Sequence, residues 1–429
     1  MSVKPLRIGI AGLGTVGVGV VRIVRKHAEL LEARAGRRIE IAAVSARSRD
    51  KDRGIDISQY DWEDDPVAIA RRDDIDVVVE LMGGSDGPAK ACVETALANA
   101  KQVVTANKAL LAHHGQKLAL SAEENGAVLR FEAAVAGGIP VVKALTEGLA
   151  GNEIARVMGV MNGTCNYILT RMEATHQGYN ALFEEAHKLG FLEADPQLDV
   201  GGIDAGHKLS LLSAIAFGTQ VNFDAVELEG IEQIELRDIE EAAEMGYRIK
   251  LLGVAQMTGR GLEQRMSPCL VPAASPLGQL EGGTNMVVIE GDMVDQIVLS
   301  GPGAGEGPTA SAVMGDVIDL ARGLRISTFG QPAATLAKAK PARAVVPAPY
   351  YIRMELQDKP GAMAKVAAVL GEAGISIDRM RQHGHRDPTA PVIFVTHKCA
   401  RTQVDEALEQ LGSNPVVAAP PVAIRIEQV

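Results

Sequence analysis

Apolar and polar positions follow two alternating patterns along the first third of the chain. Short apolar runs are separated by longer stretches with the 3.6-residue period of amphipathic helices. The first of these stretches predicts a helix over Val16–Leu31. The apolar runs predict strands at Leu6–Ala11, Ile39–Ser45, Val77–Leu81, Val103–Thr105 and Val128–Phe131. Because strands that alternate with helices indicate βαβ units, we expect residues 1–140 to form a parallel, doubly wound sheet.

The pattern changes after residue 140 and again near residue 330. Residues 141–330 mix several strands with longer helices, predicted over Leu182–Leu189, Ala205–Phe217 and Ile239–Met245, which indicates an α+β domain. Residues 331–349 are rich in Ala, Pro and Lys and have few hydrophobic anchors. This composition predicts a linker.

The remaining residues, 350–429, predict a small separate domain. Its expected strands are Tyr350–Leu356, Ile375–Met380, Val392–Thr396 and Val422–Glu427, and its expected helices are Gly361–Ala373 and Thr402–Leu411. The order βαββαβ is that of the ferredoxin-like unit. The expected fold class is therefore α/β, with an α+β middle domain and a ferredoxin-like C-terminal domain.

Composition and charge narrow the range of functions. The chain has 429 residues, of which 47% are hydrophobic, so it can bury several cores and is not globally disordered. Its formal net charge of −11 argues against nucleic acid or an anionic membrane as the main partner. Its four cysteines are far apart, and no apolar stretch is long enough to span a bilayer. These features predict a cytoplasmic protein with reduced thiols.

A glycine-rich turn follows the first predicted strand and opens the first predicted helix. Gly12-Leu-Gly14-Thr-Val-Gly17 has the GxGxxG spacing of the Rossmann dinucleotide-binding fingerprint. The first glycine permits the tight turn, the second permits close approach of the pyrophosphate, and the third permits helix–strand packing. The helix N-terminus, at Thr15 and Val16, offers N–H groups to the phosphates. This context predicts a Rossmann domain that binds a nicotinamide dinucleotide.

The end of the second predicted strand bears on the choice between NAD and NADP. NAD sites usually place an acidic residue there, which holds the ribose 2′-hydroxyl group. Glu40 comes too early for this role, and Asp50 follows two arginines, Arg47 and Arg49. Arginine accommodates a 2′-phosphate, so Arg47 favours NADP, while NAD stays possible. The alternative is that both arginines are solvated loop charges.

A cluster of carboxylates precedes a helix that carries one lysine. Glu193, Asp195, Asp199 and Asp204 are crowded together, and Lys208 follows four residues after Asp204. Residues four apart share one face of a helix, so Asp204 and Lys208 are expected to lie together. Such a group can bind a cationic substrate and donate a proton to a developing alkoxide. An ordinary surface ion pair is the alternative.

Three motifs together resemble the homoserine dehydrogenase family. They are Val103-Val-Thr-Ala-Asn-Lys108, Asn162-Gly-Thr-Cys-Asn-Tyr-Ile168, and the stretch from Glu193-Ala-Asp-Pro to Gly202-Ile-Asp204-Ala-Gly-His-Lys208. With no aspartokinase module ahead of it, the chain resembles the monofunctional form, with residues 141–330 as the catalytic and dimerisation domain. Leu356-Gln-Asp-Lys-Pro-Gly361 before a helix is similar to the ACT domain, an amino-acid-sensing regulatory module.

The resemblance implies a reaction and the residues that perform it. The family interconverts aspartate 4-semialdehyde and homoserine, with NAD(P) as the hydride carrier, on the route to threonine, methionine and isoleucine. Glu193 and Asp204 match its substrate-binding residues, and Lys208 matches its proton donor. Lys108 matches a lysine beside cofactor and substrate, so which lysine donates the proton stays open. For Asp199, direct substrate contact and support of the loop both stay open.

The resemblance also implies a cation site, further cofactor contacts and regulation. Family members bind a monovalent cation such as Na+ at the positions that match Glu132, Val135, Gly137 and Ile139. Gly190 and Gly305 are expected near the cofactor, although a plain connecting loop is the alternative for Gly305. Both resembled families pair subunits, so at least a homodimer is expected. Threonine is the expected effector of the ACT domain, which the linker is expected to make separable.

Two other functions compete with this interpretation. A pure amino-acid sensor would bind nucleotide without catalysis, but it would not need the carboxylate–lysine set. Another Rossmann dehydrogenase with an ACT domain, such as prephenate or phosphoglycerate dehydrogenase, would use a catalytic histidine. No histidine of this sequence stands in such a motif.

Overall fold

The N-terminal domain is a parallel sheet with the strand order β3-β2-β1-β4-β5-β6, in a computed structural model that describes residues 4–192, 195–343, 345–382 and 388–429. This order is that of dinucleotide-binding Rossmann domains. The strands are β1 (Leu6–Ala11), β2 (Ile39–Ser45), β3 (Asp61–Trp62), β4 (Val77–Glu80), β5 (Gln102–Thr105) and β6 (Leu129–Arg130). The five predicted strands are confirmed, and the short β3 is added at the sheet edge.

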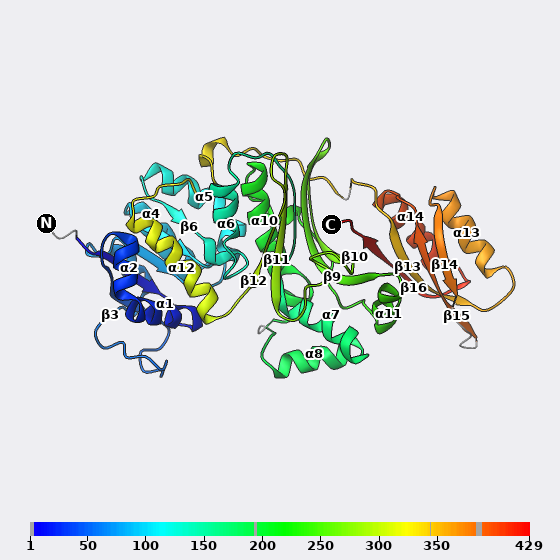
Figure 1. The fold of residues 1–429 in the computed structure, drawn as a ribbon, viewed down its shortest axis with the longest axis horizontal. Helices are drawn as coiled ribbons and strands as arrows, with labels where there is room; N and C mark the ends of the chain where they lie inside the picture. Colours follow the sequence, from blue (N-terminus) through cyan, green and yellow to red (C-terminus); the bar gives the residue numbers. More distant parts are fainter. Residues whose placement is uncertain (1–3, 193–194, 344, 383–387) are drawn as a thin grey trace.

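Helices cover both faces of this sheet (Figure 1). One face carries α1 (Thr15–Lys26), α2 (Ala28–Ala35) and α12 (Glu306–Ala321), and the other carries α3 (Pro66–Arg71), α4 (Pro88–Ala98) and α5 (Lys108–Glu124). The prediction of a single helix over Val16–Leu31 is wrong, because the structure has two helices there. The helical run breaks at His27, whose φ of −117° and ψ of 26° are not helical, and restarts as α2.

Helix α12 joins the N-terminal domain from a distant part of the chain. In Figure 1 it lies as a yellow helix among the blue and cyan elements of that domain. Its residues Ala310, Val313 and Val317 are fully buried in the same core as Ile10 and Val20. The sequence pattern assigned this helix to the middle domain, but its apolar face completes the N-terminal core.

The middle of the chain forms a second, mixed sheet with helices on one side. Its strands are β7 (Ile154–Val160), β8 (Glu227–Leu228), β9 (Tyr247–Thr258), β10 (Gly261–Pro272), β11 (Thr284–Gly291) and β12 (Asp295–Pro302). The helices are α6 (Val141–Lys143), α7 (Gly163–Thr175), α8 (Tyr179–Lys188), α9 (Gln197–Val200), α10 (Ile203–Phe217) and α11 (Leu236–Glu244). Helix α10 packs between α5 and β9, so it is buried on almost every side, including at its polar residues.

The C-terminal domain has the predicted βαββαβ order. It consists of β13 (Tyr350–Gln357), α13 (Ala362–Glu372), β14 (Ile377–Gln382), β15 (Thr389–Thr396), α14 (Arg401–Gly412) and β16 (Val417–Ile426). Its strands do not form a separate sheet. Cys269 and Leu270 of β10 pair in parallel with Arg425 and Ile426 of β16, so the C-terminal strands continue the sheet of the middle domain.

The stretch predicted to be a linker is hydrogen-bonded to the domains around it at several of its described residues. Ala337 O accepts a hydrogen bond from Gln220 N at 2.9 Å, and Lys340 O accepts one from Leu262 N at 2.9 Å. Leu336 is 4% exposed. Backbone hydrogen bonds and a few buried side chains therefore hold this stretch in place, although its composition is typical of a flexible linker. None of the helices in the described ranges has the length and apolarity needed to cross a membrane.

Candidate active site

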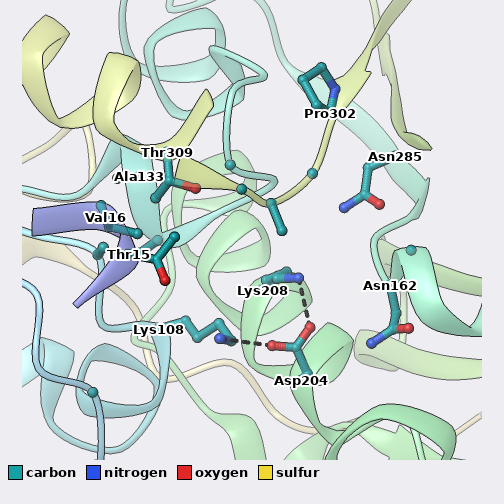
Figure 2. Close-up of a pocket in the computed structure, with 18 of the residues that line it drawn as sticks. Thr15, Val16, Lys108, Ala133, Asn162, Asp204, Lys208, Asn285, Pro302 and Thr309 are labelled. Carbon is teal, nitrogen blue, oxygen red and sulfur yellow. Dashed lines mark hydrogen bonds and ion pairs between the residues drawn. The ribbon is translucent and has the colours of Figure 1, made fainter. Parts of the chain in front are cut away.

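A cavity of about 680 Å³ lies between the Rossmann sheet and the second sheet (Figure 2). It is bordered by the turn after β1, the loops after β4 and β5, the starts of α7 and α10, and the loop between β12 and α12. Open α/β sheets bind their ligands at the carboxyl ends of parallel strands. The cavity has this position, and elements of the middle domain form its opposite wall.

The three fingerprint glycines have the local environments that their spacing predicted. Gly12 has φ +111°, and a Cβ there would lie 2.6 Å from Leu81 O. A Cβ at Gly17 would lie 2.1 Å from Gly12 O, so α1 can approach the turn this closely only with glycine at that position. The space around Gly14 is open, as the approach of a pyrophosphate requires.

The start of α1 faces the cavity. Thr15 and Val16 line it, and no side chain caps the helix N-terminus, so backbone N–H groups are presented to an anion. Arg47 is exposed just after β2 and is not among the residues that line the cavity. Because β2 neighbours β1, this arginine lies on the side of the glycine turn where a dinucleotide places its ribose.

Arg53, which no motif singled out, fixes the loop that carries Arg47. Its Nε donates to Leu13 O at 3.1 Å, and its Nη1 donates to Lys51 O at 2.8 Å. Its guanidinium also lies over the Trp62 ring, 5.9 Å from the centroid. The loop after β2 is therefore tied to the glycine turn through a side chain.

Three charged side chains meet in the cavity (Figure 2). Asp204 Oδ2 accepts a hydrogen bond from Lys208 Nζ at 2.7 Å, and Asp204 Oδ1 lies 2.9 Å from Lys108 Nζ. Asp204 and Lys208 belong to α10 and are 7% and 8% exposed, whereas Lys108 is the first residue of α5. The predicted pairing of Asp204 and Lys208 is thus present, and their burial excludes an ordinary surface ion pair.

The two lysines keep Asp204 ionised in spite of its burial. Burial alone would raise the pKa of Asp204, but the ammonium groups of Lys208 and Lys108 hold it well below its usual range. Lys208 Nζ also donates to Met161 O at 2.8 Å. Two of the three donors of its ammonium group are therefore engaged by Asp204 and Met161, which leaves one for a ligand.

A buried hydrogen-bond chain positions the helix that carries Lys108. Glu80, at the end of β4, is fully buried and accepts from Thr105 Oγ1 at 2.6 Å. Thr105 Oγ1 accepts from Asn107 N at 3.0 Å, and Asn107 Oδ1 caps α5 by accepting from Leu110 N at 3.0 Å. Burial raises the pKa of Glu80, against the opposing effect of its hydrogen bonds. No motif pointed to Glu80.

The remaining carboxylates of the cluster differ in their surroundings. Asp199 is 4% exposed, lines the cavity and accepts from Asn162 Nδ2 at 2.9 Å. Asn162 in turn caps α7, because its Oδ1 accepts from Cys165 N at 2.8 Å. Asp195 is exposed, and its Oδ1 accepts from Gln197 N at 3.1 Å, so it shapes the loop.

The other residues expected near the cofactor and substrate are placed as follows. Gly190, with φ +75°, follows α8 and lines the cavity. Gly305, with φ +117°, is the N-cap of α12 and also lines the cavity. Glu193 lies outside the described residues.

Glu132, the carboxylate of the expected cation site, follows β6 and is 2% exposed. Its carboxylate accepts from Val142 N at 2.9 Å and from Lys143 N at 2.8 Å. Burial, together with the nearby carboxylate of Asp316, raises the pKa of Glu132 to about 7. The two backbone N–H groups and the charge of Lys143 oppose this rise without cancelling it.

The three backbone positions of the expected cation site lie in the loop that follows. Val135 and Ile139 are buried, and Gly137, with φ +54°, lines the cavity. A Cβ at Gly137 would lie 2.4 Å from Gly303 O, so the loop packs tightly against the segment before α12. The described residues hold no group of three or more His, Cys, Asp or Glu side chains suited to a metal. One carboxylate with backbone carbonyl oxygens is instead the ligand type that suits a hard cation.

Family models match most of the chain. The model described as homoserine dehydrogenase matches residues 140–318, the homoserine dehydrogenase NAD binding domain matches residues 12–132, and the ACT domain matches residues 350–416. A homoserine dehydrogenase of Neisseria gonorrhoeae is 42% identical over 434 residues, covering 99% of this chain and 99% of that protein. The chain belongs to the homoserine dehydrogenase family.

Solved homoserine dehydrogenases have the same fold. The enzyme from Thiobacillus denitrificans has a TM-score of 0.94 at 38% identity, covering 100% of this chain and 99% of that one. A hyperthermophilic archaeal homoserine dehydrogenase mutant in complex with NADPH has a TM-score of 0.63 at 27% identity, covering 74% and 97%. The protein is accordingly an oxidoreductase of this family, with an NAD-binding domain and an ACT domain.

Proposed function

We propose that the enzyme interconverts L-homoserine and L-aspartate 4-semialdehyde with NADP as the preferred hydride carrier. The observation that carries this proposal is the convergence of Lys108 and Lys208 on Asp204, in a cavity that begins at the dinucleotide-binding turn. A primary alcohol or an aldehyde bound between the turn and this group would meet both a hydride carrier and a proton donor. Family membership supports homoserine as that alcohol.

The chemistry requires one proton transfer by the protein. A bound nicotinamide dinucleotide supplies or accepts the hydride at the substrate's terminal carbon. In the reducing direction the aldehyde oxygen becomes an alkoxide, which takes a proton from an ammonium group. Lys208 is the proposed donor because it is buried and because Asp204 and Met161 fix its ammonium while leaving one N–H for the substrate oxygen. In the oxidising direction the neutral amine of Lys208 takes the hydroxyl proton.

Lys108 and the carboxylates are proposed to position the substrate. Lys108, on the Rossmann side of Asp204, is proposed to polarise the substrate oxygen beside the nicotinamide. Asp199, which lines the cavity, and Glu193 are proposed to accept hydrogen bonds from the substrate's α-ammonium, since carboxylates are strong acceptors for a cationic donor. Asp204 is proposed to act on the substrate through the lysines, because each of its oxygens already faces one of them.

The preference for NADP rests on Arg47. This arginine is exposed beside the glycine turn, and the loop after β2 contains no acidic residue ahead of it. A guanidinium at this point favours a 2′-phosphate. The archaeal relative in complex with NADPH supports the same choice.

A monovalent cation such as Na+ is proposed to bind Glu132 together with the carbonyl oxygens of Val135, Gly137 and Ile139. The support for this site is the buried carboxylate and the loop that packs closely against Gly303 and Ala304. A cation there would neutralise Glu132 and brace the loop on which Gly305 approaches the cofactor.

Regulation and assembly are also proposed. Threonine is the proposed effector of the ACT domain, whose strand β16 is hydrogen-bonded to the catalytic sheet. A homodimer is proposed because β12 is an edge strand of the second sheet with exposed residues along its length. Unpaired edges of this kind are ready to pair with another chain.

The decisive experiment is a steady-state assay with homoserine and each cofactor, with and without threonine. Reduction of NADP with homoserine, faster than reduction of NAD and sensitive to threonine, supports the proposal in full. Oxidation of homoserine without any response to threonine would support the proposed reaction but would reject threonine as the effector. Binding of nucleotide without turnover of homoserine would instead indicate a sensor.

A further inference from the structure

One buried lysine of the middle domain takes no part in the proposed reaction. Lys250, on β9, is 2% exposed and is not among the residues that line the cavity. Burial, followed by the nearby charge of Arg248, lowers the pKa of Lys250 to about 8, against the opposing effects of Glu173 and Glu281. Burying an ammonium group is costly unless other groups replace its water, so a lysine at this position needs an explanation.

The ammonium group of Lys250 is satisfied by neutral oxygen atoms. Its Nζ donates to Asn166 Oδ1 on α7 at 2.9 Å, and it also donates to Leu280 O in the segment between β10 and β11. Buried lysines usually have a carboxylate partner, and an apolar side chain of similar volume would fill the same space at lower cost. The lysine is therefore best explained by what its two partners hold in place.

Asn166 extends this contact to the same segment. Its side chain is 1% exposed, and its Nδ2 donates to Gly282 O at 2.8 Å. Lys250 and Asn166 thus hold residues 280–282 together, because one side chain donates to Leu280 O and the other to Gly282 O. Since Asn166 lies near the start of α7, the segment is fastened to that end of the helix.

The same segment continues directly into the wall of the cavity. Gly283 lines the cavity, as does Gly163 at the start of α7. These two glycines are in close contact, because a Cβ at Gly163 would lie 2.7 Å from Gly283 O. Figure 2 shows Asn162 and Asn285, their near neighbours in sequence, on the side of the cavity away from Thr15. The wall held by Lys250 is therefore on the substrate side of the cavity rather than on the cofactor side.

We propose that Lys250 is a positioning residue for the substrate side of the active-site cavity. Its ammonium group, together with Asn166, holds the segment before β11 against α7 and so sets the place of Gly283 in the wall. Lys250 acts through these neighbours, since it does not line the cavity itself. The inference rests on the proposed function, because a displaced wall is expected to weaken the binding of homoserine and to spare that of NADP.

The first test is Lys250→Met, which removes the ammonium group and keeps an unbranched side chain of similar length. The KM for homoserine should rise about tenfold, because a hydrogen bond from a charged donor is worth about that much or more, while kcat is largely kept. The Kd for NADP, measured by fluorescence titration, should stay unchanged. Lys338→Met, at an exposed position, is the control and should behave as wild type.

Asn166→Asp separates the position of the wall from the stability of the protein. Lys250→Met leaves two buried oxygen atoms without a donor, which lowers stability by itself. In Asn166→Asp the new carboxylate still accepts from Lys250, but nothing donates to Gly282 O. This variant should unfold at about the urea concentration of the wild type, since the new charge is paired, and should still raise the KM for homoserine. A purely structural role for Lys250 predicts a wild-type KM in Asn166→Asp.

Hydrogen exchange in the full-length enzyme tests the same contact without turnover. Loss of a hydrogen bond that holds a segment raises the population of its open form, so the amides of residues 280–284 should exchange about tenfold faster in Lys250→Met and in Asn166→Asp. Peptide-resolved mass spectrometry measures these rates. Lys338→Met should exchange as the wild type does.

Three outcomes would overturn the inference. A wild-type KM for homoserine in both Lys250→Met and Asn166→Asp would leave the wall independent of these residues. A weaker Kd for NADP, with an unchanged KM for homoserine, would place their effect on the cofactor side. Unchanged exchange of residues 280–284 would show that the segment is held without Lys250. Failure of the wild-type enzyme to oxidise homoserine is a different result, because it would reject the proposed function while the exchange rates still decide whether Lys250 holds the segment.

Discussion

The ammonium group of Lys108 lies 2.9 Å from the carboxylate of Asp204, and this contact joins two domains. Lys108 begins a helix of the Rossmann domain, whereas Asp204 begins a helix of the middle domain. The cofactor side and the substrate side of the cavity are therefore linked by an ion pair at the reacting centre. Movement of one domain against the other would change the electric field at Lys208, the proposed proton donor.

Replacing Lys208 should separate chemistry from binding. Lys208→Ala should lower kcat by about 10²- to 10⁴-fold, the usual contribution of a positioned acid or base, while the Kd for NADP changes little. Lys117→Ala, on the exposed side of α5, is the control and should behave as wild type. Near-normal kcat in Lys208→Ala, with activity abolished in Lys108→Ala, would reverse the roles of the two lysines.

Replacing Glu193 by glutamine should affect binding rather than chemistry. The change keeps size and hydrogen bonding but removes a charge, so the KM for homoserine should rise while kcat is largely kept. Steady-state kinetics with saturating NADP measure both quantities. A large fall in kcat at unchanged KM would contradict the assignment of Glu193 to the α-ammonium.

Arg47 should discriminate between the two cofactors. Arg47→Ala should reduce kcat/KM for NADPH about tenfold to a hundredfold and spare NADH, because only NADPH carries the 2′-phosphate. Arg49→Ala, a neighbouring exposed arginine, serves as the control. Equal losses with both cofactors would place Arg47 away from the ribose.

Sodium should stabilise the wild-type enzyme through Glu132. At a free concentration ten times its Kd, a bound ion adds about 1.4 kcal/mol to the free energy of unfolding. The unfolding midpoint in NaCl is compared with that in choline chloride at equal ionic strength. Glu132→Gln should abolish the difference, whereas Glu153→Gln, at an exposed position, should keep it. If the difference between the two salts persists in Glu132→Gln, sodium binds at a site that does not include Glu132.

The C-terminal strand should stabilise the catalytic sheet. Glu427 is 6% exposed, forms a buried ion pair with Arg265, and accepts from Arg425 Nε at 2.9 Å. Removing one partner of a buried pair is strongly destabilising, so Glu427→Gln should cost about 3 kcal/mol in the free energy of unfolding. Urea titration measures this cost, with exposed Glu409→Gln as the control. Unchanged stability would show that Arg265 is satisfied without the C-terminal strand.

The same contacts revise the expectation that the ACT domain can be cut away cleanly. A chain that ends after Lys340 loses β16, so part of β10 becomes an unpaired edge and Arg265 loses Glu427. We therefore expect the truncated protein to unfold at lower urea and to aggregate more readily than the full chain. If the truncated enzyme is soluble, active and as stable as the full chain, the original expectation of a separable ACT domain is supported.

His207 should make stability depend on pH. Burial, followed by His113 and the neighbouring lysines, lowers the pKa of His207 to about 4, against the opposing effect of Asp204. The unfolded chain therefore binds more protons than the native state between pH 6.5 and pH 4, and stability falls as the pH falls through this window. At pH 5 the loss is about 2 kcal/mol relative to pH 7. His207→Gln should lose less stability between the two pH values, and an identical loss would contradict this origin.

The parts of the fold that depend on local pattern were predictable. The strands of the Rossmann sheet are short apolar runs, and the conformation of the GxGxxG turn is set by its own glycines. Both could therefore be located from residues that are near in sequence. The pairing of Asp204 with Lys208 follows from their spacing on one helix. Glu193 stays a prediction, because it lies outside the described residues.

The parts that depend on distant segments were not predictable. Glu80 and Asn285 stand in ordinary strand patterns, and only the folded chain brings Asn285 to the cavity and Glu80 to the hydrogen-bond chain beneath α5. Nothing within α12 shows that it packs against α1 rather than in the middle domain. Residues 331–349 have few large apolar side chains, yet backbone hydrogen bonds and small buried residues hold them in place.

The parallel pairing of β16 with β10 has a consequence for the order of synthesis. Residues 417–426 leave the ribosome well after β10, at residues 261–272, with which they pair. Domains generally fold from the N-terminus as they are made. The catalytic sheet must therefore wait, with one edge open and Arg265 without Glu427, until the regulatory domain has been translated. An interrupted nascent chain therefore lacks the strand that completes this edge of the sheet.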